Sequence, residues 1–256
     1  MKVKVLKDAY ELGVAAAEYS AQILNDAIQK QGSARLVLST GESQFETLKA
    51  LVTKDVDWSK VEMFHLDEYV NLSETHPASF RRYLKERFTG KVPLKRAFFV
   101  DGEGDIEKNI KKLSTEIRKA PVDLALVGIG ENAHVAFNDP PADFDTKDAF
   151  ITVNLDDSCK QQQVREGWFP SVEEVPPQAI TMTVHQILQS RVIVSAVPFK
   201  NKAKAVERTL KSKLSNKIPA TALKTHRHWV LFLDGESSSS VDEGTLKSFE
   251  QNKGLV

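Results

Sequence analysis

The sequence predicts an α/β protein with a doubly wound, mostly parallel sheet and helices on both faces, a Rossmann-like three-layer sandwich. Two observations carry this prediction. Short apolar stretches of strand length alternate with amphipathic helical patterns along most of the chain, which is typical of parallel sheets covered on both faces. Residues 122–128 are almost continuously apolar, as expected for a strand buried on both sides. Because no internal repeat or linker is visible, we expect residues 1–256 to form a single domain.

Capping residues and apolar spacing predict the elements of the first half. Asp8 can cap a helix whose apolar side chains recur every three or four residues from Leu12 to Ala27, and Gly32 ends it. Beyond it we expect a strand over 35–39, a helix over 43–53, a strand over 61–66, a helix over 77–88, a strand over 97–100, a helix over 104–118 and a strand over 122–128.

The pattern loosens between residues 139 and 177, which are polar and contain several prolines. A strand over 150–155 is the one element expected inside this stretch. Long irregular stretches within a compact domain are often functional. Order returns with an expected helix over 183–189, a strand over 191–197, a helix over 200–211, a strand over 229–233 and a loop over 237–240.

Composition narrows the class of function. The 35 basic and 35 acidic residues balance, and no uninterrupted basic block is present, so we expect neither nucleic acid nor a membrane as a partner. The one cysteine, Cys159, allows no intrachain disulfide and no cysteine-based zinc site. The N-terminus lacks the apolar core of a signal peptide, and no apolar run approaches the roughly 20 residues of a membrane helix. We therefore expect a cytoplasmic protein.

Ligands of open α/β sheets bind at the carboxyl ends of the strands, so we expect the functional residues in the loops there. The first loop is Ser39-Thr40-Gly41-Glu42-Ser43. Hydroxyls and backbone N–H groups at the start of a helix form an anion site, although the Gly-Lys-Ser/Thr ending of a Walker loop is missing. Glu42 must then point away from a bound phosphate. An ordinary turn with a serine cap is the alternative.

Two adjacent carboxylates, Asp67 and Glu68, follow the strand predicted over 61–66. A half-buried carboxylate beside another acid has a raised pKa and can carry a proton. Neighbouring residues of an extended chain face opposite ways, so we expect one of the two to face the ligand. The alternative is a helix-capping aspartate followed by a solvated glutamate.

A third loop combines Gly128 and Gly130 with a histidine, His134. Histidine titrates near neutrality and suits proton transfer, and Glu131, Asn132 and Asp139 lie close enough in sequence to orient it. Dinucleotide binding is a rival interpretation of the glycines, but the fingerprint is weak because alanine stands where a third glycine often sits.

Lysines open the helix predicted over 200–211, with Lys202 among them. A lysine at a helix N-terminus opposes the helix dipole unless an anion lies nearby. The segment therefore fits a second part of an anion site. A solvated basic face is the alternative.

Taken together, these segments resemble the glucosamine-6-phosphate deaminase family, a group that also contains 6-phosphogluconolactonases. The resemblance runs from Thr40 to about Asp234 and rests on LVLSTGES, HLDEYVNLSETHPASF, DLALVGIGENAHVAFNDP and the residues after Asn201. Within the group, LDEYV followed by HPASF, and AFNDP after the histidine, are similar to the deaminases.

The resemblance implies a role for each candidate residue. Asp67 matches the general base that moves a proton between sugar carbons C2 and C1, and Glu68 is its motif neighbour. His134 matches the histidine that assists ring opening. The implied phosphate-binding set is Ser39, Thr40, Gly41, Glu42, Ser43 and Lys202.

The implied reaction converts glucosamine 6-phosphate and water to fructose 6-phosphate and ammonia. The implied partner is thus a small phosphorylated amino sugar, and neither a metal nor an organic cofactor is required.

The sequence also departs from the family pattern. Asn132 replaces an aspartate, and Asp139 replaces the glutamate that orients the histidine. A phosphate-binding arginine expected within 156–176 has only Arg165 as a counterpart, and Arg165 is offset. Two other functions stay open: a 6-phosphogluconolactonase with a water activated by His134, and a non-catalytic sugar-phosphate-binding regulatory protein. A homo-oligomer also stays open.

Overall fold

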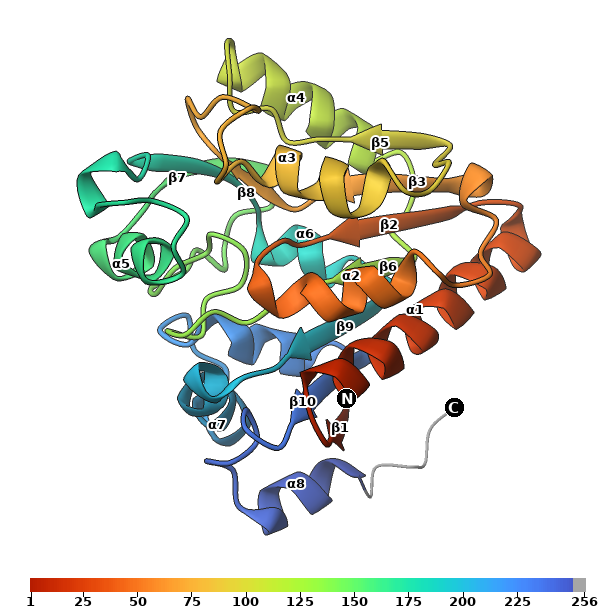
Figure 1. The fold of residues 1–256 in the computed structure, drawn as a ribbon, viewed down its shortest axis with the longest axis vertical. Coiled ribbons are helices and arrows are strands. Elements are labelled where there is room, and N and C mark those ends of the chain that lie inside the picture. The colour runs from red at the N-terminus through yellow and green to blue at the C-terminus, as the bar shows by residue number, and fades with distance from the viewer. Residues whose placement is uncertain (251–256) are drawn as a thin grey trace.

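A seven-stranded parallel sheet runs through the centre of the computed structural model, which describes residues 1–250 (Figure 1). Its strand order is β1–β10–β9–β6–β2–β3–β5. The strands are β1 Lys2–Leu6, β2 Ala34–Leu38, β3 Val61–His65, β5 Arg96–Phe98, β6 Leu124–Leu126, β9 Val192–Val197 and β10 Trp229–Asp234. Leu38 is level with both His65 and Leu126 in the sheet. The segments that follow β2, β3 and β6 therefore leave the same edge side by side.

Helices cover both faces of this sheet. They are α1 Ala9–Gln31, α2 Phe45–Leu51, α3 Phe80–Leu84, α4 Ile106–Ile117, α5 Asp157–Arg165, α6 Val184–Leu188, α7 Ala203–Lys211 and α8 Glu243–Glu250. Short helical turns are η1 Glu42–Gln44, η2 Trp58–Lys60, η3 Lys85–Thr89, η4 Val172–Glu174, η5 Lys200–Lys202 and η6 Pro219–Thr225. Asp8 caps α1 by accepting a bond from the Glu11 N–H, and Gly32 ends it in the left-handed conformation.

Two apolar clusters fill the space between the sheet and its helices. Leu24 of α1, Leu48 of α2 and Leu84 of α3 pack against one face. Leu113 of α4 and Val206 of α7 pack against the other. This arrangement confirms the predicted three-layer, doubly wound fold.

A second, antiparallel sheet was not predicted. It contains β4 Asp67–Tyr69, β8 Gln178–Met182 and β7 Phe150–Asn154, in the order β4–β8–β7. Only β7 was expected from the sequence. The strand β4 has three residues, and its partner β8 lies more than a hundred residues further along the chain, so no local pattern reveals the pairing. The interpretation of Asp67 as a helix cap is wrong, because Asp67 begins a strand.

Other corrections concern helices. The helix predicted over 77–88 begins at Phe80, because the Ser79 side chain caps it, and it changes to a π-helical turn at Lys85. The helix predicted over 43–53 is the turn η1 followed by α2. The strand β1 and the helices α5 and α8 were missed. The polar composition of α5 is typical of a loop, although Asp156 caps the helix.

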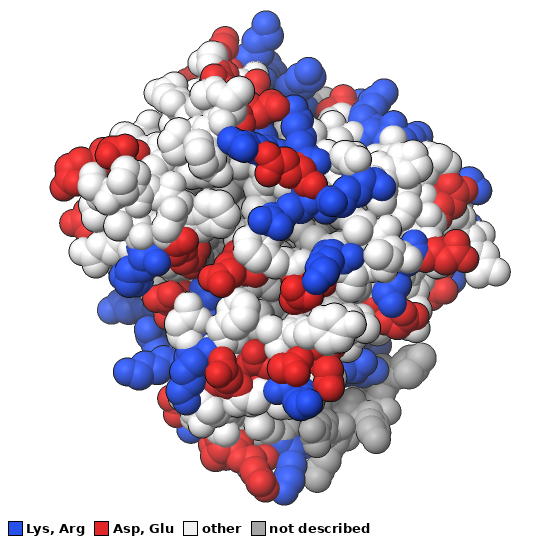
Figure 2. All heavy atoms as spheres, viewed as in Figure 1, with Lys and Arg blue, Asp and Glu red and all other residues white. Residues whose placement is uncertain are grey.

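No helix within residues 1–250 is long and apolar enough to cross a membrane. On the face drawn in Figure 2, acidic and basic side chains are intermixed over the whole view. This intermixing agrees with the zero formal net charge of the chain.

Candidate active site

The four strands β9, β6, β2 and β3 are neighbours in the sheet (Figure 1). The segments that follow them line a cleft. Each strand delivers one segment to its wall, as expected for ligand sites of parallel sheets. The lining residues are Ser39, Thr40, Gly41, Glu42, Ser43, Leu66, Asp67, Phe80, Gly128, Ile129, Gly130, His134, Ala136, Phe137, Gln162, Gln163, Glu166, Trp168, Phe199, Asn201 and Lys202. The cleft thus brings together eight of the eleven residues predicted from the sequence. The three outside the wall are Glu68, Asn132 and Asp139.

The loop after β2 contributes hydroxyl groups. Ser39 is buried, and its Oγ makes no hydrogen bond within residues 1–250, so it is available to a ligand. Gly41 has a φ of 101°, a conformation that favours glycine, and its carbonyl accepts a bond of 2.9 Å from the Tyr83 hydroxyl. Glu42 is exposed at the rim of the cleft.

Asp67 lines the cleft at the start of β4. The residue is only 5% exposed. Burial, together with the charge of Glu68, raises the pKa of Asp67 to about 8. A carboxyl group with a pKa near neutrality can both take and return a proton.

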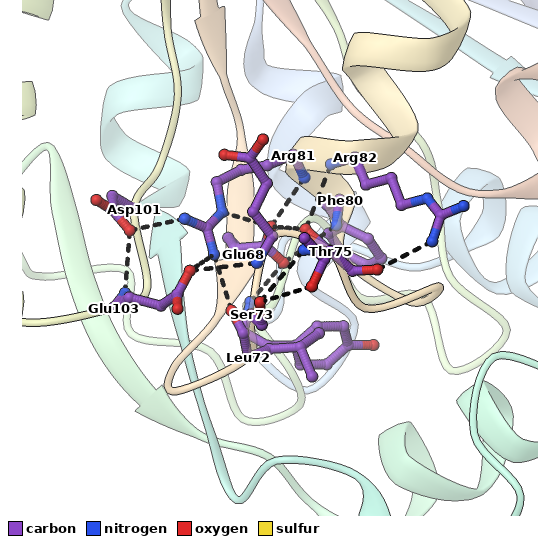
Figure 3. Close-up of polar contacts among 12 residues, drawn as sticks. Glu68, Leu72, Ser73, Thr75, Phe80, Arg81, Arg82, Asp101 and Glu103 are labelled. Atoms are coloured by element: carbon purple, nitrogen blue, oxygen red, sulfur yellow. Dashed lines mark hydrogen bonds and ion pairs between the residues drawn. The ribbon is translucent and has the colours of Figure 1, made fainter.

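Glu68 is not among the lining residues, and its carboxylate lies in a shell of donors (Figure 3). It accepts bonds from the backbone N–H groups of Tyr69, Phe80 and Arg81 and from the Ser79 hydroxyl. Burial raises the pKa of Glu68, and these donors offset part of the rise. The structure therefore does not place Glu68 among the ligand-facing residues.

The Arg81 guanidinium fixes this arrangement from the other side (Figure 3). It lies 3.3 Å from the Glu68 carboxylate and 2.8 Å from each of Asp101 and Glu103. It also donates to the Leu72 carbonyl at 2.8 Å. A buried carboxylate that is paired in this way holds its position, and Glu68 in turn fixes the direction of β4.

His134 and Asp139 form a pair beside the cleft. His134 Nδ1 lies 3.1 Å from Asp139 Oδ1, in a contact that is not aligned as a hydrogen bond. Asn132 donates to the same Asp139 oxygen at 3.2 Å and accepts the His134 backbone N–H at 2.9 Å. Burial raises the pKa of Asp139, but His134 and Asn132 together lower it by more, so the net shift is downward. The 3.1 Å distance shows that the Asp139 side chain reaches the histidine.

Gly130 gives the His134 ring its place. A Cβ atom at Gly130 would lie 2.2 Å from Cε1 and Nε2 of the imidazole, much closer than van der Waals contact. Only a glycine at this position leaves room for the ring in its observed orientation.

Lys202 supplies the cation of the cleft. It is 6% exposed at the end of η5, and its ammonium makes no hydrogen bond or ion pair within residues 1–250. Burial lowers the pKa of Lys202, while Glu166, Glu131 and Glu42 oppose this effect. A buried ammonium group without a protein partner is suited to an anionic ligand.

The remaining wall comes from α5 and the turn after it, which sequence reasoning missed. This segment contributes Gln162, Gln163, Glu166 and Trp168. The feature of the sequence that could have predicted α5 is Asp156, whose side chain caps the N-terminus of the helix. Arg165 faces outward and pairs with Glu131 at 2.9 Å, so the one arginine within 156–176 does not line the cleft.

The site can therefore perform acid–base chemistry next to a bound anion. Asp67 and His134, two side chains of types that can transfer protons, line the same cleft. Lys202 and the hydroxyls of the Thr40 loop hold an anionic group.

Comparison with known proteins shows the family of the chain. Residues 7–232 match the model of the glucosamine-6-phosphate isomerases/6-phosphogluconolactonase family. The chain belongs to this family. It is 33% identical over 258 residues to a glucosamine-6-phosphate deaminase of Thermoanaerobacter sp. (strain X514), an alignment that covers 98% of this chain and 99% of the relative. A deaminase of Streptococcus sanguinis (strain SK36) is 32% identical and covers 93% and 98% of the two chains.

Solved structures of this family share the fold. A monomeric glucosamine-6-phosphate deaminase superposes with a TM-score of 0.86 at 31% identity, over 94% of this chain and all of the other. A 6-phosphogluconolactonase from Thermotoga maritima reaches a TM-score of 0.74 at 19% identity, over 91% and 99% of the two chains. The lactonase likeness therefore concerns the fold alone.

Proposed function

We propose that the protein is a glucosamine-6-phosphate deaminase, which converts glucosamine 6-phosphate and water to fructose 6-phosphate and ammonia. The observation that carries this proposal is that Asp67, His134 and Lys202 face one cleft. The curated relatives named as deaminases, which match nearly the whole chain, support the same substrate.

Each group has a role in the proposed reaction. Lys202 and the hydroxyls of Ser39, Thr40 and Ser43 bind the phosphate. His134, oriented by Asp139 and Asn132, moves the proton between the ring oxygen and O1 that opens the pyranose.

Asp67 then takes the proton from C2 and returns it to C1, while O1 gains the proton that the ammonium group at C2 loses. C2 thereby becomes an iminium carbon, which water hydrolyses to the ketose with release of ammonia. This role needs a base whose pKa lies near the working pH. The pKa of Asp67, about 8, meets this need.

The direct test is release of ammonia and formation of fructose 6-phosphate from millimolar glucosamine 6-phosphate by the purified protein. We expect Asp67→Asn to lower kcat about 10²- to 10⁴-fold, the usual contribution of a general base, while phosphosugar binding persists. Acid release from 6-phosphogluconolactone without ammonia release would instead identify a lactonase. Tight binding of glucosamine 6-phosphate with no turnover would identify a regulatory sugar-phosphate-binding protein.

A further inference from the structure

Glu166 is a carboxylate in the wall of the cleft that the proposed reaction does not use. It directly follows α5 and lines the same cavity as Lys202. Its Oε1 accepts a bond of 2.7 Å from Gln162, and its Oε2 accepts a bond of 3.2 Å from the Trp168 indole. Both donors also line the cleft. A carboxylate held at both oxygens is a fixed part of the wall rather than a mobile surface group.

A carboxylate such as Glu166 is unusual in the wall of a cleft that binds an anion. The ionisable side chains that line it are Glu42, Asp67, His134, Glu166 and Lys202. Glu131, which also lies near Lys202, is not among the lining residues and accepts hydrogen bonds from Arg165 and Asn201. The described wall therefore carries one lysine and two glutamates, besides Asp67, whose raised pKa of about 8 keeps it mostly protonated at neutral pH. Such a wall repels a bare phosphate dianion more than a site lined by cations does.

A ligand that brings a hydrogen-bond donor as well as an anion fits this wall better. An ionised carboxylate only accepts hydrogen bonds. Each oxygen of Glu166 retains accepting capacity beyond its bond to Gln162 or Trp168. A sugar hydroxyl is a donor of this kind, and a bond between a hydroxyl and a carboxylate is charge-assisted and therefore strong.

We propose that Glu166 is a specificity-determining substrate contact, whose carboxylate accepts a hydrogen bond from a sugar hydroxyl while Lys202 binds the phosphate of the same molecule. The site thereby favours phosphorylated sugars over inorganic phosphate. This inference rests on the proposed function for the identity of the sugar, and it concerns binding rather than the chemical step.

The test compares two ligands in two proteins. Asp67→Asn serves as the background, because its much slower turnover allows glucosamine 6-phosphate to be titrated, and Glu166→Gln is added to it. We expect the double variant to bind glucosamine 6-phosphate about tenfold more weakly, because a neutral hydrogen bond to glutamine replaces a stronger charged one. We expect it to bind inorganic phosphate several-fold more tightly, because a repelling charge is gone. Isothermal titration calorimetry measures both.

The opposite signs distinguish a substrate contact from other roles. If Glu166 only holds α5 in place, both ligands bind more weakly, and the proposal is overturned. If it only repels the phosphate, both bind more tightly, and the proposal is again overturned. Equal affinities in the two proteins overturn it as well. Glu174→Gln in the same background is the matched control. This substitution removes the same charge, but Glu174 is exposed and lies outside the cleft.

Failure of this inference is separable from failure of the proposed function. Ammonia release by the protein with Asp67 intact tests the deaminase activity without reference to Glu166. The crossed affinities test the contact without reference to turnover. A protein that shows the crossed affinities but releases no ammonia keeps the Glu166 contact and loses the deaminase assignment.

Discussion

Asp67 and Glu68 are neighbours on β4, and their carboxylates face opposite sides of that strand: Asp67 lines the cleft, whereas Glu68 is fully buried against Arg81 and the start of α3. The alternation of side chains along an extended chain produces this division. One carboxyl group is left for proton transfer, and the other anchors the strand that holds it. The raised pKa of Asp67 follows from both its burial and the charge of its neighbour.

The activity should depend on pH through Asp67. With a pKa of about 8, this group is mostly protonated at pH 6 and cannot act as a base, so kcat/KM should fall by up to tenfold for each pH unit below 8. A carbon-13 NMR titration of aspartate-labelled protein, with Asp67→Asn to assign the signal, measures the pKa without substrate. A carboxyl signal that titrates near 4 would contradict the assignment.

The free energy of unfolding should also depend on Asp67, but it should fall with rising pH, whereas activity should rise. The folded protein holds a proton on Asp67 that the unfolded chain releases above pH 3.8. The free energy of unfolding that this group contributes therefore decreases as pH rises from about 4 to 8, by at most about 1.4 kcal/mol per pH unit. Asp67→Asn should thus stabilise the protein more at pH 8 than at pH 5, as measured by urea unfolding. Parallel stability curves for the two proteins would show that the raised pKa is wrong.

Arg81→Met should destabilise the fold strongly. It leaves the Glu68 carboxylate buried without its cation, and removing one partner of a buried pair costs about 3–5 kcal/mol. Thermal unfolding monitored by circular dichroism measures the loss. Arg82→Met is the control, because Arg82 forms an exposed pair with Glu86, and such pairs contribute at most about 1 kcal/mol. Similar losses in both variants would argue against the anchoring role of Arg81.

Gly130→Ala should impair catalysis more than folding. The added methyl group would overlap the His134 ring, so the imidazole must turn away from its contact with Asp139. A displacement of this size costs about 10²-fold in kcat. Gly235→Ala is the control, since Gly235 lies outside the cleft and a Cβ there would have Lys7 O as its nearest neighbour at 3.5 Å. Steady-state kinetics beside a melting curve separates the two effects, and unchanged kcat in Gly130→Ala would refute the steric argument.

Local signals in the sequence predicted the large sheet and much of the cleft. Asp8 and Gly32 mark the ends of α1 through capping chemistry that acts within a few residues. The alternation of strands and helices then places Asp67, His134 and the Thr40 loop at one edge of a sheet.

The missed parts of the site depend on contacts that are distant in sequence or on a surface of mixed character. Asp67 pairs with Thr181 across the small sheet, and no pattern near either residue reports that pairing. The helix α5 is rich in glutamine, so it lacks an apolar stripe, although Gln162 and Gln163 are buried against the cleft. Glu166 was overlooked for the same reason.

The small sheet makes one mechanical unit of two parts of the cleft. β4 carries Asp67 and is bonded to β8, β8 is bonded to β7, and β7 ends at Asn154, three residues before α5 begins. Asp67 and the helix α5, which both line the cleft, are therefore linked through a short path of hydrogen-bonded strands. A substitution that weakens the pairing of β8 will therefore disturb both Asp67 and α5, although no residue of β8 lines the cleft.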